Sequence, residues 1–160
     1  MNATAATPAN PIRLHPRRLL LPLEFFEVLT GLDPEKARSL CEDGSLTAFN
    51  LATAVDGKRA KLHVCRESVE RYEPGHTFKP NACLDEIIAK TLPAIGSASA
   101  STATVGATEL AFRWCCSSER IVSLVRAGEL RAVGKRPSPK ATRRIAYLSA
   151  FNFLKGRVLI

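Results

Sequence analysis

The ten positions from Lys135 to Arg144 carry the side chains with the most evident chemistry in this chain. Five of the ten are cations, namely Lys135, Arg136, Lys140, Arg143 and Arg144. So many like charges on a short segment repel one another unless a polyanion neutralises them. The segment therefore predicts phosphate binding, with a flexible, solvated loop as the alternative interpretation. The same two interpretations apply to a smaller group of cations, Lys58, Arg59 and Lys61.

The net charge of +8 is unevenly distributed over the 160 residues. Residues 1–22 carry three arginines and no acid, and residues 107–160 carry eleven basic side chains against three acidic ones. Residues 23–73 instead hold seven basic side chains against ten acidic ones. A polyanionic partner is therefore expected mainly for the C-terminal third of the chain and for its N-terminal arm.

No arrangement of residues predicts catalysis. The three histidines are scattered, and His63 falls on the outward phase of an expected strand. We find no glycine-rich phosphate loop, no paired acids and no metal-ligand spacing. Five cysteines form no C-x-x-C pair, and their odd number argues against a disulfide framework. We therefore expect a protein that is not an enzyme, that has inert cysteines and that needs neither a metal nor another cofactor.

The sequence also lacks the signals of membrane proteins and exported proteins. No apolar run approaches the roughly 18–20 residues of a membrane span. The start of the chain lacks the cationic and apolar regions of a secretory signal. A cytoplasmic protein is expected, associated with the nucleoid when it is bound to DNA.

Two stretches that lie 84 positions apart share one pattern, as Gly44 and Gly128 illustrate. The residues Leu40, Gly44, Leu46 and Ala48 recur as Leu124, Gly128, Leu130 and Ala132. Two short helical segments precede each glycine, and two strand-like segments joined by a basic turn follow it. This pattern predicts an α+β fold of two tandem winged helix-turn-helix units. The expected divisions are a disordered basic arm at 1–21, the first unit at 22–73, a connector with one short helix at 74–106 and the second unit at 107–160.

In the first unit, Gly31 should end a helix whose apolar face consists of Leu23, Phe26, Val28 and Leu29. Asp33 and Pro34 predict the start of the next helix, as N-cap and first helical residue. The buried stripe of that helix is expected at Ala37, Leu40 and Cys41. Strands over 46–52 and 61–65, joined by a turn at Asp56-Gly57, and a helical turn over 66–72 complete the unit.

The connector should contain one amphipathic helix, with apolar residues at Leu84, Ile87, Ile88 and Leu92. This helix could dock on either unit, pair with a second subunit or act as a local cap on the first unit. Residues 95–106 are rich in Ala, Ser and Thr and predict a flexible tether.

In the second unit, Thr108 should cap a helix that runs through Trp114, and Ser117 or Ser118 should cap the next helix. The buried stripe is expected at Ile121, Leu124 and Val125. Strands over 130–133 and 145–148 should flank the basic loop, and Ser149 should cap a final helical turn. The apolar tail is expected to add a strand or a contact surface.

These motifs resemble the excisionase-like and MerR-like winged helix-turn-helix DNA-binding domains. The better match is ELAFRWCCSSERIVSLVRAGELRAVG in the second unit, followed by EFFEVLTGLDPEKARSLCEDGSLTAF with LHVCRESVERY in the first. The resemblance implies a recognition helix in the major groove and a wing at the adjacent minor groove or backbone. One departure is Trp114-Cys115-Cys116, which replaces the usual Leu-Gly-hydrophobic turn and puts the geometry of that turn in question.

The resemblance also implies which side chains contact DNA. In the second unit they are the wing cations 135–144 and, on the recognition helix, Ser118, Glu119, Arg120 and Ser123. Arg120 is the candidate base reader because arginine on guanine is the commonest specific contact, and a solvated surface arginine is the alternative. The first unit offers Lys36 and Ser39 on its recognition helix, together with Lys58, Arg59 and Lys61 on its wing.

Double-stranded DNA is therefore the expected partner, in the role of an excisionase-type recombination directionality factor or a small transcriptional regulator from a bacterium or mobile element. A recombinase or another protein is expected to bind through the first unit and the connector helix, and a homo-oligomer on DNA is a further option. The alternative class is a protein-interaction adaptor or assembly factor that resembles a terminase small subunit. The acidic first unit and the apolar connector helix favour that alternative.

Overall fold

Two small antiparallel sheets and the helices beside them make up the computed structural model, which describes residues 15–53, 56, 59–73, 83–134 and 143–159. The first unit comprises β1 (Leu20–Pro22), α1 (Leu23–Thr30), α2 (Pro34–Glu42), β2 (Ala48–Asn50), β3 (Leu62–Cys65) and α3 (Arg66–Glu70). The second comprises β4 (Thr104–Gly106), α5 (Ala107–Arg113), α6 (Ser118–Arg126), β5 (Ala132–Val133), β6 (Arg144–Ala146) and α7 (Tyr147–Lys155). Between them lies α4 (Leu84–Thr91). The predicted α+β class is confirmed.

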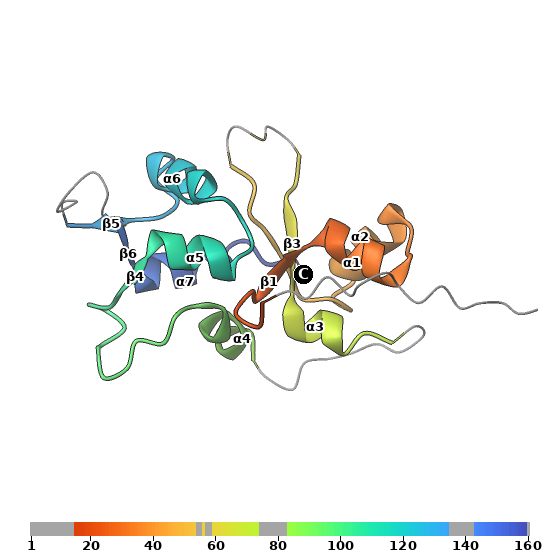
Figure 1. Ribbon diagram of the computed structural model, residues 1–160, viewed down its shortest axis with the longest axis horizontal. Coiled ribbons are helices and arrows are strands. Elements are labelled where there is room, and N and C mark those ends of the chain that lie inside the picture. The colour runs from red at the N-terminus through yellow and green to blue at the C-terminus, as the bar shows by residue number, and fades with distance from the viewer. Residues whose placement is uncertain (1–14, 54–55, 57–58, 74–82, 135–142, 160) are drawn as a thin grey trace, which may run out of the picture.

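The sequence repeat is also a repeat of structure. Leu20 and Thr104 begin β1 and β4, and Pro34 and Ser118 begin α2 and α6, so corresponding elements again start 84 positions apart. Each sheet places the third strand of its unit between the first and the second, in the orders β1-β3-β2 and β4-β6-β5. Figure 1 shows the two units side by side along the long axis of the molecule.

The repeat extends to single hydrogen bonds. The backbone N–H of Thr47 donates to Ser68 Oγ over 3.1 Å, and that of Arg131 donates to Ser149 Oγ over 2.8 Å. Each serine lies inside the last helix of its unit and anchors the approach to the second strand. The prediction that Ser149 caps a helix is therefore wrong, because α7 already begins at Tyr147.

The first two helices of each unit are joined through a residue with a left-handed backbone conformation. Gly31 has a φ of 69°, and Cys115, at the corresponding position, has a φ of 52°. The turn at Trp114-Cys115-Cys116 thus keeps the expected backbone although it lacks the glycine. Trp114 is fully buried and stacks on Phe153, with 5.8 Å between the ring centres.

The starts of α2 and α6 are at the predicted positions, although the Asp33 side chain makes no capping hydrogen bond. Asp33 and Ser117 are the N-cap residues, and Ser117 Oγ accepts a hydrogen bond from the backbone N–H of Arg120 over 3.1 Å. Thr108, by contrast, is not a cap. Helix α5 starts two residues earlier than predicted, at Ala107 directly after β4, with Gly106 as its N-cap.

Helix α1 buries less of its apolar surface than its sequence predicts. Leu23 and Phe26 lie in the core, but 77% of Val28 and 54% of Leu29 is exposed. The helix has only eight residues and rests on the core along the Leu23–Phe26 side alone, so the positions on its opposite side face solvent.

Two segments that were expected to be irregular are strands. Leu20–Pro22, inside the predicted disordered arm, pairs with β3, and Leu20 is fully buried. Thr104–Gly106, inside the predicted tether, pairs with β6, and Val105 is buried. Each strand contributes apolar side chains to a core, and that burial stabilises its order.

One core runs through both units. The larger apolar cluster joins Leu20, Phe49 and Leu51 of the first unit to Trp114, Ile121 and Leu124 of the second. The tail after α7 crosses back to the first unit, where Val158 pairs with Phe49 and the backbone N–H of Leu159 donates to Ala48 O over 2.9 Å. The tail, which was expected to add a strand or a contact surface, thus contacts β2 of the other unit through a single antiparallel bridge.

The connector helix α4 is confirmed and docks mainly on the second unit. Ile88 and Leu92 belong to the larger cluster, and Lys155 of α7 pairs with Asp85 over 3.0 Å. Figure 1 shows α4 below the seam between the units. None of the helices in the described ranges has the length and apolar content to cross a membrane.

Candidate nucleic-acid interface

Arg120, near the start of α6, is held by the first unit. One guanidinium nitrogen lies 2.5 Å from Asp56 Oδ2 and 3.0 Å from Leu51 O, and the other terminal nitrogen lies 3.3 Å from Asp56 Oδ1. The side chains of Arg120 and Asp56 are only 20% and 14% exposed. Because the guanidinium donates to three acceptors within the molecule, the predicted base contact of Arg120 is at odds with this geometry.

The electrostatics of this pair are mutually stabilising. The hydrogen bond from Arg120 is the main cause that lowers the pKa of Asp56, and the backbone N–H of Thr53, 2.7 Å from Oδ2, adds to it. The carboxylate therefore stays charged at neutral pH. The β2–β3 hairpin of the first unit consequently covers the N-terminal end of α6 on its Arg120 side (Figure 1).

The other predicted residues of α6 are placed differently. Ser118 and Glu119 are exposed, and Ser123 is half-buried. Arg126, which was not among the predicted contacts, is exposed in the last turn of α6. Its spacing of seven residues from Glu119 places both on one side of the helix, and this spacing was the signal that could have identified it.

The cations of the second unit divide into two groups. The cations that form ion pairs lie at the seam, where each also contacts the first unit or α4: Arg113, Arg120, Lys155 and Arg157. The second group forms no ion pair within the described residues and lies around β5 and β6 or at the end of α6: Arg126, Arg131, Arg143 and Arg144. The predicted contacts Lys135, Arg136 and Lys140 lie outside the described residues.

The two groups differ because of their surroundings. Arg144 donates to Thr104 Oγ1 over 3.0 Å and to Thr104 O over 2.8 Å, which keeps its charge beside the strands without neutralising it. Arg157 instead pairs with Glu129 over 3.2 Å and lies 5.0 Å from the centre of the Phe153 ring. Unneutralised cations thus gather at the end of the second unit that is farther from the first.

The candidate contacts of the first unit lie elsewhere. Lys36 and Ser39 are exposed on α2, at the opposite end of the molecule from β5 (Figure 1). Lys58 is outside the described residues, whereas Arg59 is exposed and Lys61 is half-buried. The structure thus brings the hairpin of the first unit, but not its helix α2, to helix α6 of the second.

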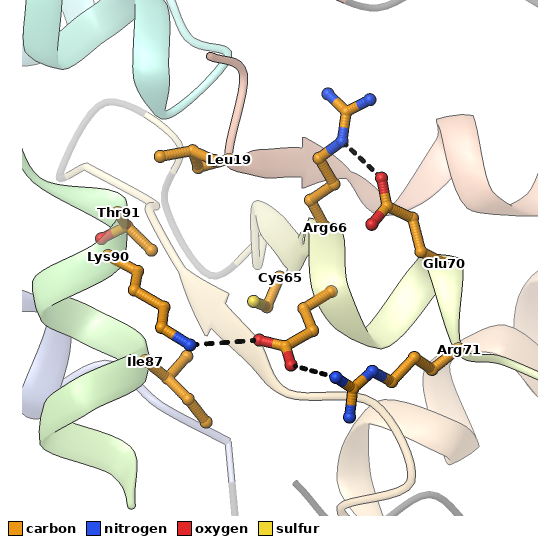
Figure 2. Close-up of a pocket in the computed structure, with 9 residues that line it drawn as sticks. Leu19, Cys65, Arg66, Glu70, Arg71, Ile87, Lys90 and Thr91 are labelled. Carbon is orange, nitrogen blue, oxygen red and sulfur yellow. Dashed lines mark hydrogen bonds and ion pairs between the residues drawn. The ribbon is translucent and has the colours of Figure 1, made fainter. Parts of the chain in front are cut away.

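A cleft of about 360 Å³ opens between α3 and α4 (Figure 2). Glu67 lies between Lys90, at 3.9 Å, and Arg71, at 3.0 Å, while Arg66 pairs with Glu70 at 2.8 Å. Because the cations that line the cleft are all paired, it presents no unpaired cation to a polyanion, and the Lys90–Glu67 pair joins α4 to the first unit.

Burial shifts the pKa of two cysteines and of one histidine. Burial raises the pKa of the thiols of Cys41 and Cys116 to about 12, so both remain protonated at neutral pH. His63 is buried, contrary to the outward position that strand alternation predicted, and burial lowers its pKa. The described residues contain no group of three metal-ligating side chains.

Comparisons of the chain with models of protein families, with curated proteins and with solved structures find no match. The resemblance to winged helix-turn-helix domains therefore stays a prediction from the sequence.

Proposed function

We propose that this protein binds double-stranded DNA through the outer end of its second unit. The observation that carries the proposal is the division of the cations, since those at the seam are paired while Arg126, Arg131, Arg143 and Arg144 form no ion pair with another described residue. Cations that the fold leaves without acids, next to a sequence with three more at 135–140, favour a phosphate backbone as their partner.

The arrangement of elements supports DNA as the nucleic acid. Helices α5 and α6 form a helix-turn-helix, and a two-stranded hairpin follows α6, as expected for a recognition helix with a wing. The exposed side of α6 carries Glu119 and Arg126, and the hairpin carries Arg131 and Arg144. In this proposal the wing supplies most of the affinity through phosphates, and Arg120 is not a base reader.

Fluorescence anisotropy of the full chain with labelled duplexes over a range of salt concentrations tests the proposal. If about five phosphates are neutralised, the logarithm of the association constant should fall with the logarithm of salt with a slope of about −4 to −5. Arg131→Ala and Arg126→Ala should each weaken binding to every duplex and reduce the steepness of the slope by about one.

Arg38→Ala is the matched control, because Arg38 is an exposed helix arginine of the first unit that pairs with Glu42 over 3.1 Å. Its affinity for the duplexes should equal that of the wild type. A salt-independent affinity, or an equal loss in the control, would contradict DNA binding through the second unit. Whether the role is recombination or transcription stays a prediction from the resemblance.

A further inference from the structure

Helix α1 presents an apolar surface that nothing in the described structure covers. Val28 and Leu29 are 77% and 54% exposed, more than any other large hydrophobic side chain among the described residues. Phe25, one turn before both of them, is half-buried and packs against the core of the first unit. The spacing of these three residues is that of one helix face, so α1 is apolar on a second side besides the buried one.

The duplicated helix α5 shows how this fold covers the same face. Phe112 of α5 corresponds to Val28, and Arg113 corresponds to Leu29. The segment 15–19 lies across this face. The guanidinium carbon of Arg18 is 4.4 Å from the centre of the Phe112 ring, and the His15 ring meets the same ring edge-on at 5.2 Å.

Backbone contacts complete this cover. The backbone N–H of Leu19 donates to Arg113 O over 2.7 Å, and a terminal nitrogen of Arg18 lies 3.5 Å from Phe112 O. The last carbonyls of a helix lack partners within the helix and attract cations. An extended segment that contains arginine thus satisfies both the apolar and the polar groups at this end of α5.

The sides of α1 next to the corresponding face are acidic. Glu24 and Glu27 stand where α5 has Thr108 and the buried Ala111, whereas Phe25 stands where α5 has Glu109. A groove of about 250 Å³ between α1 and α2 is lined by Glu24, Glu27 and Glu35, and by helical spacing Glu24 lies between this groove and Val28. The groove's one cation, Arg38, pairs with Glu42 outside the groove lining. A ligand complementary to this surface would therefore carry both apolar groups and positive charge.

We propose that the exposed face of α1 and the adjoining acidic groove bind an extended, arginine-containing segment of a protein partner. This segment would lie on α1 as residues 15–19 lie on α5. The proposal is independent of DNA binding, because it concerns the other unit and requires positive charge in the partner.

A second copy of the chain is a poorer occupant. Its own segment 15–19 is engaged with its own α5. The corresponding segment of the second unit, residues 99–103, reads Ser-Ala-Ser-Thr-Ala and carries no cation. Two α1 helices facing one another would bring their glutamates together without a compensating charge.

Binding of a labelled peptide to the full chain tests the proposal. The peptide has the sequence of residues 13–19, RLHPRRL, whose last five residues contain the contacts seen on α5. We expect saturable binding that falls about tenfold in the double variant Val28→Ser/Leu29→Ser, because part of the apolar contact is lost. Glu24→Gln/Glu27→Gln should also weaken binding, and a peptide with glutamate in place of arginine should not bind.

The matched control is Val133→Ser/Leu148→Ser, since both residues are exposed hydrophobics of the second unit, each 40% exposed. Its affinity for the peptide should be unchanged. Equal loss in this control, absence of peptide binding, or dependence on Phe112→Ala instead of Val28 would overturn the proposal. So would a dimer in sedimentation velocity that Val28→Ser/Leu29→Ser dissolves. Duplex binding measured on the same variants should be unchanged, so this proposal and the DNA proposal can fail separately.

Discussion

At the scale of single residues, Arg120 shows how a side chain expected to face a ligand can instead hold the molecule together. Its contact with Asp56 joins residues from two units, and both partners are largely removed from solvent. A charge-assisted, forked pair of this kind is worth more than an exposed pair, because leaving one partner uncompensated costs its desolvation.

We therefore expect Asp56→Asn to lower the free energy of unfolding by about 1–3 kcal/mol, since the variant keeps the shape of the side chain but loses its charge. Urea unfolding followed by circular dichroism measures the change. Glu42→Gln is the control, because the Arg38–Glu42 pair is about 60% exposed on both sides and should contribute less than about 1 kcal/mol. Equal effects of the two substitutions would mean that the seam pair has no special role.

His63 is expected to make the stability of the folded chain depend on pH. Burial lowers its pKa in the folded chain below the ordinary value of 6.5, so the unfolded chain binds the proton first as pH falls. Stability should therefore decrease as pH falls from about 7 to about 5, by at most about 1.4 kcal/mol per pH unit. Unfolding at several pH values checks this, and His63→Gln should remove the decrease.

Asp56 serves as the internal comparison for that measurement. Its pKa is lowered from 3.8 chiefly by the hydrogen bond from Arg120, so its contribution is complete above that value and is lost only as pH falls further. The Asp56→Asn variant should therefore still lose stability between pH 7 and 5. It should lack the further loss that the wild type shows below pH 3.8, where Asp56 becomes protonated. A decrease between pH 7 and 5 that persists in His63→Gln would assign it to another group.

The same residues mark what the sequence could not predict. The N-cap residues Asp33 and Ser117 and the turn residue Gly31 were predictable, because each acts through backbone neighbours a few positions away. The burial of His63 and the partner of Arg120 depend on contact with a unit many positions distant. Strand alternation assigns one face of a strand to solvent, and in β3 a second unit covers that face.

At the scale of elements, the two helix-turn-helix motifs place the same demand on the residue between their helices. Gly31 and Cys115 both have a positive φ, a conformation that costs a residue with a side chain about 1–2 kcal/mol. Glycine tolerates it freely but loses more entropy on folding. The turn of the second unit therefore carries a cost that the turn of the first avoids.

We expect Gly31→Ala to destabilise the chain by about 1 kcal/mol, although an added Cβ would meet no atom within 4 Å. Cys115→Gly should instead leave stability unchanged or raise it by up to about 1 kcal/mol. Thermal unfolding of the two variants measures both signs. The two variants make opposite changes at corresponding positions, so each serves as the control for the other. A loss of stability in both would show that the Cys115 side-chain contacts contribute more stability than its left-handed backbone costs.

Helix α4, which has a periodic apolar pattern, was predictable, and the first strand of each unit was not. Helix α4 follows from the spacing of Leu84, Ile87 and Ile88. Strands β1 and β4 have three residues each, end in Pro22 and Gly106, and lie in segments whose composition favours irregular structure. Their pairing with β3 and β6 comes from the sheet that the rest of the unit builds, which no local pattern contains.

At the scale of the whole molecule, a segment of each unit packs against the other unit, so the two units are not independent folding domains. Segment 15–19 of the first unit covers α5 of the second, and the tail after α7 joins the sheet of the first. The larger core takes side chains from both units and from α4. We therefore expect the full chain to unfold in one cooperative transition. Variants that test the proposed DNA binding should for this reason be made in the full chain.

The tail provides the decisive test of this arrangement. Ending the chain at Gly156 removes the acceptor Arg157 O for the Asn50 N–H, at 2.9 Å, and the hydrogen bond between Leu159 and Ala48. We expect a loss of about 2–4 kcal/mol, with faster hydrogen exchange at Asn50, in the first unit, although the deletion lies at the end of the second. Leu159→Pro removes the backbone donor together with the leucine side chain, so it should destabilise the chain more than Leu159→Ala, which removes most of the side chain and keeps the donor. Faster exchange confined to α7 would show that the tail serves only its own unit and that the sheet of the first unit is complete without it.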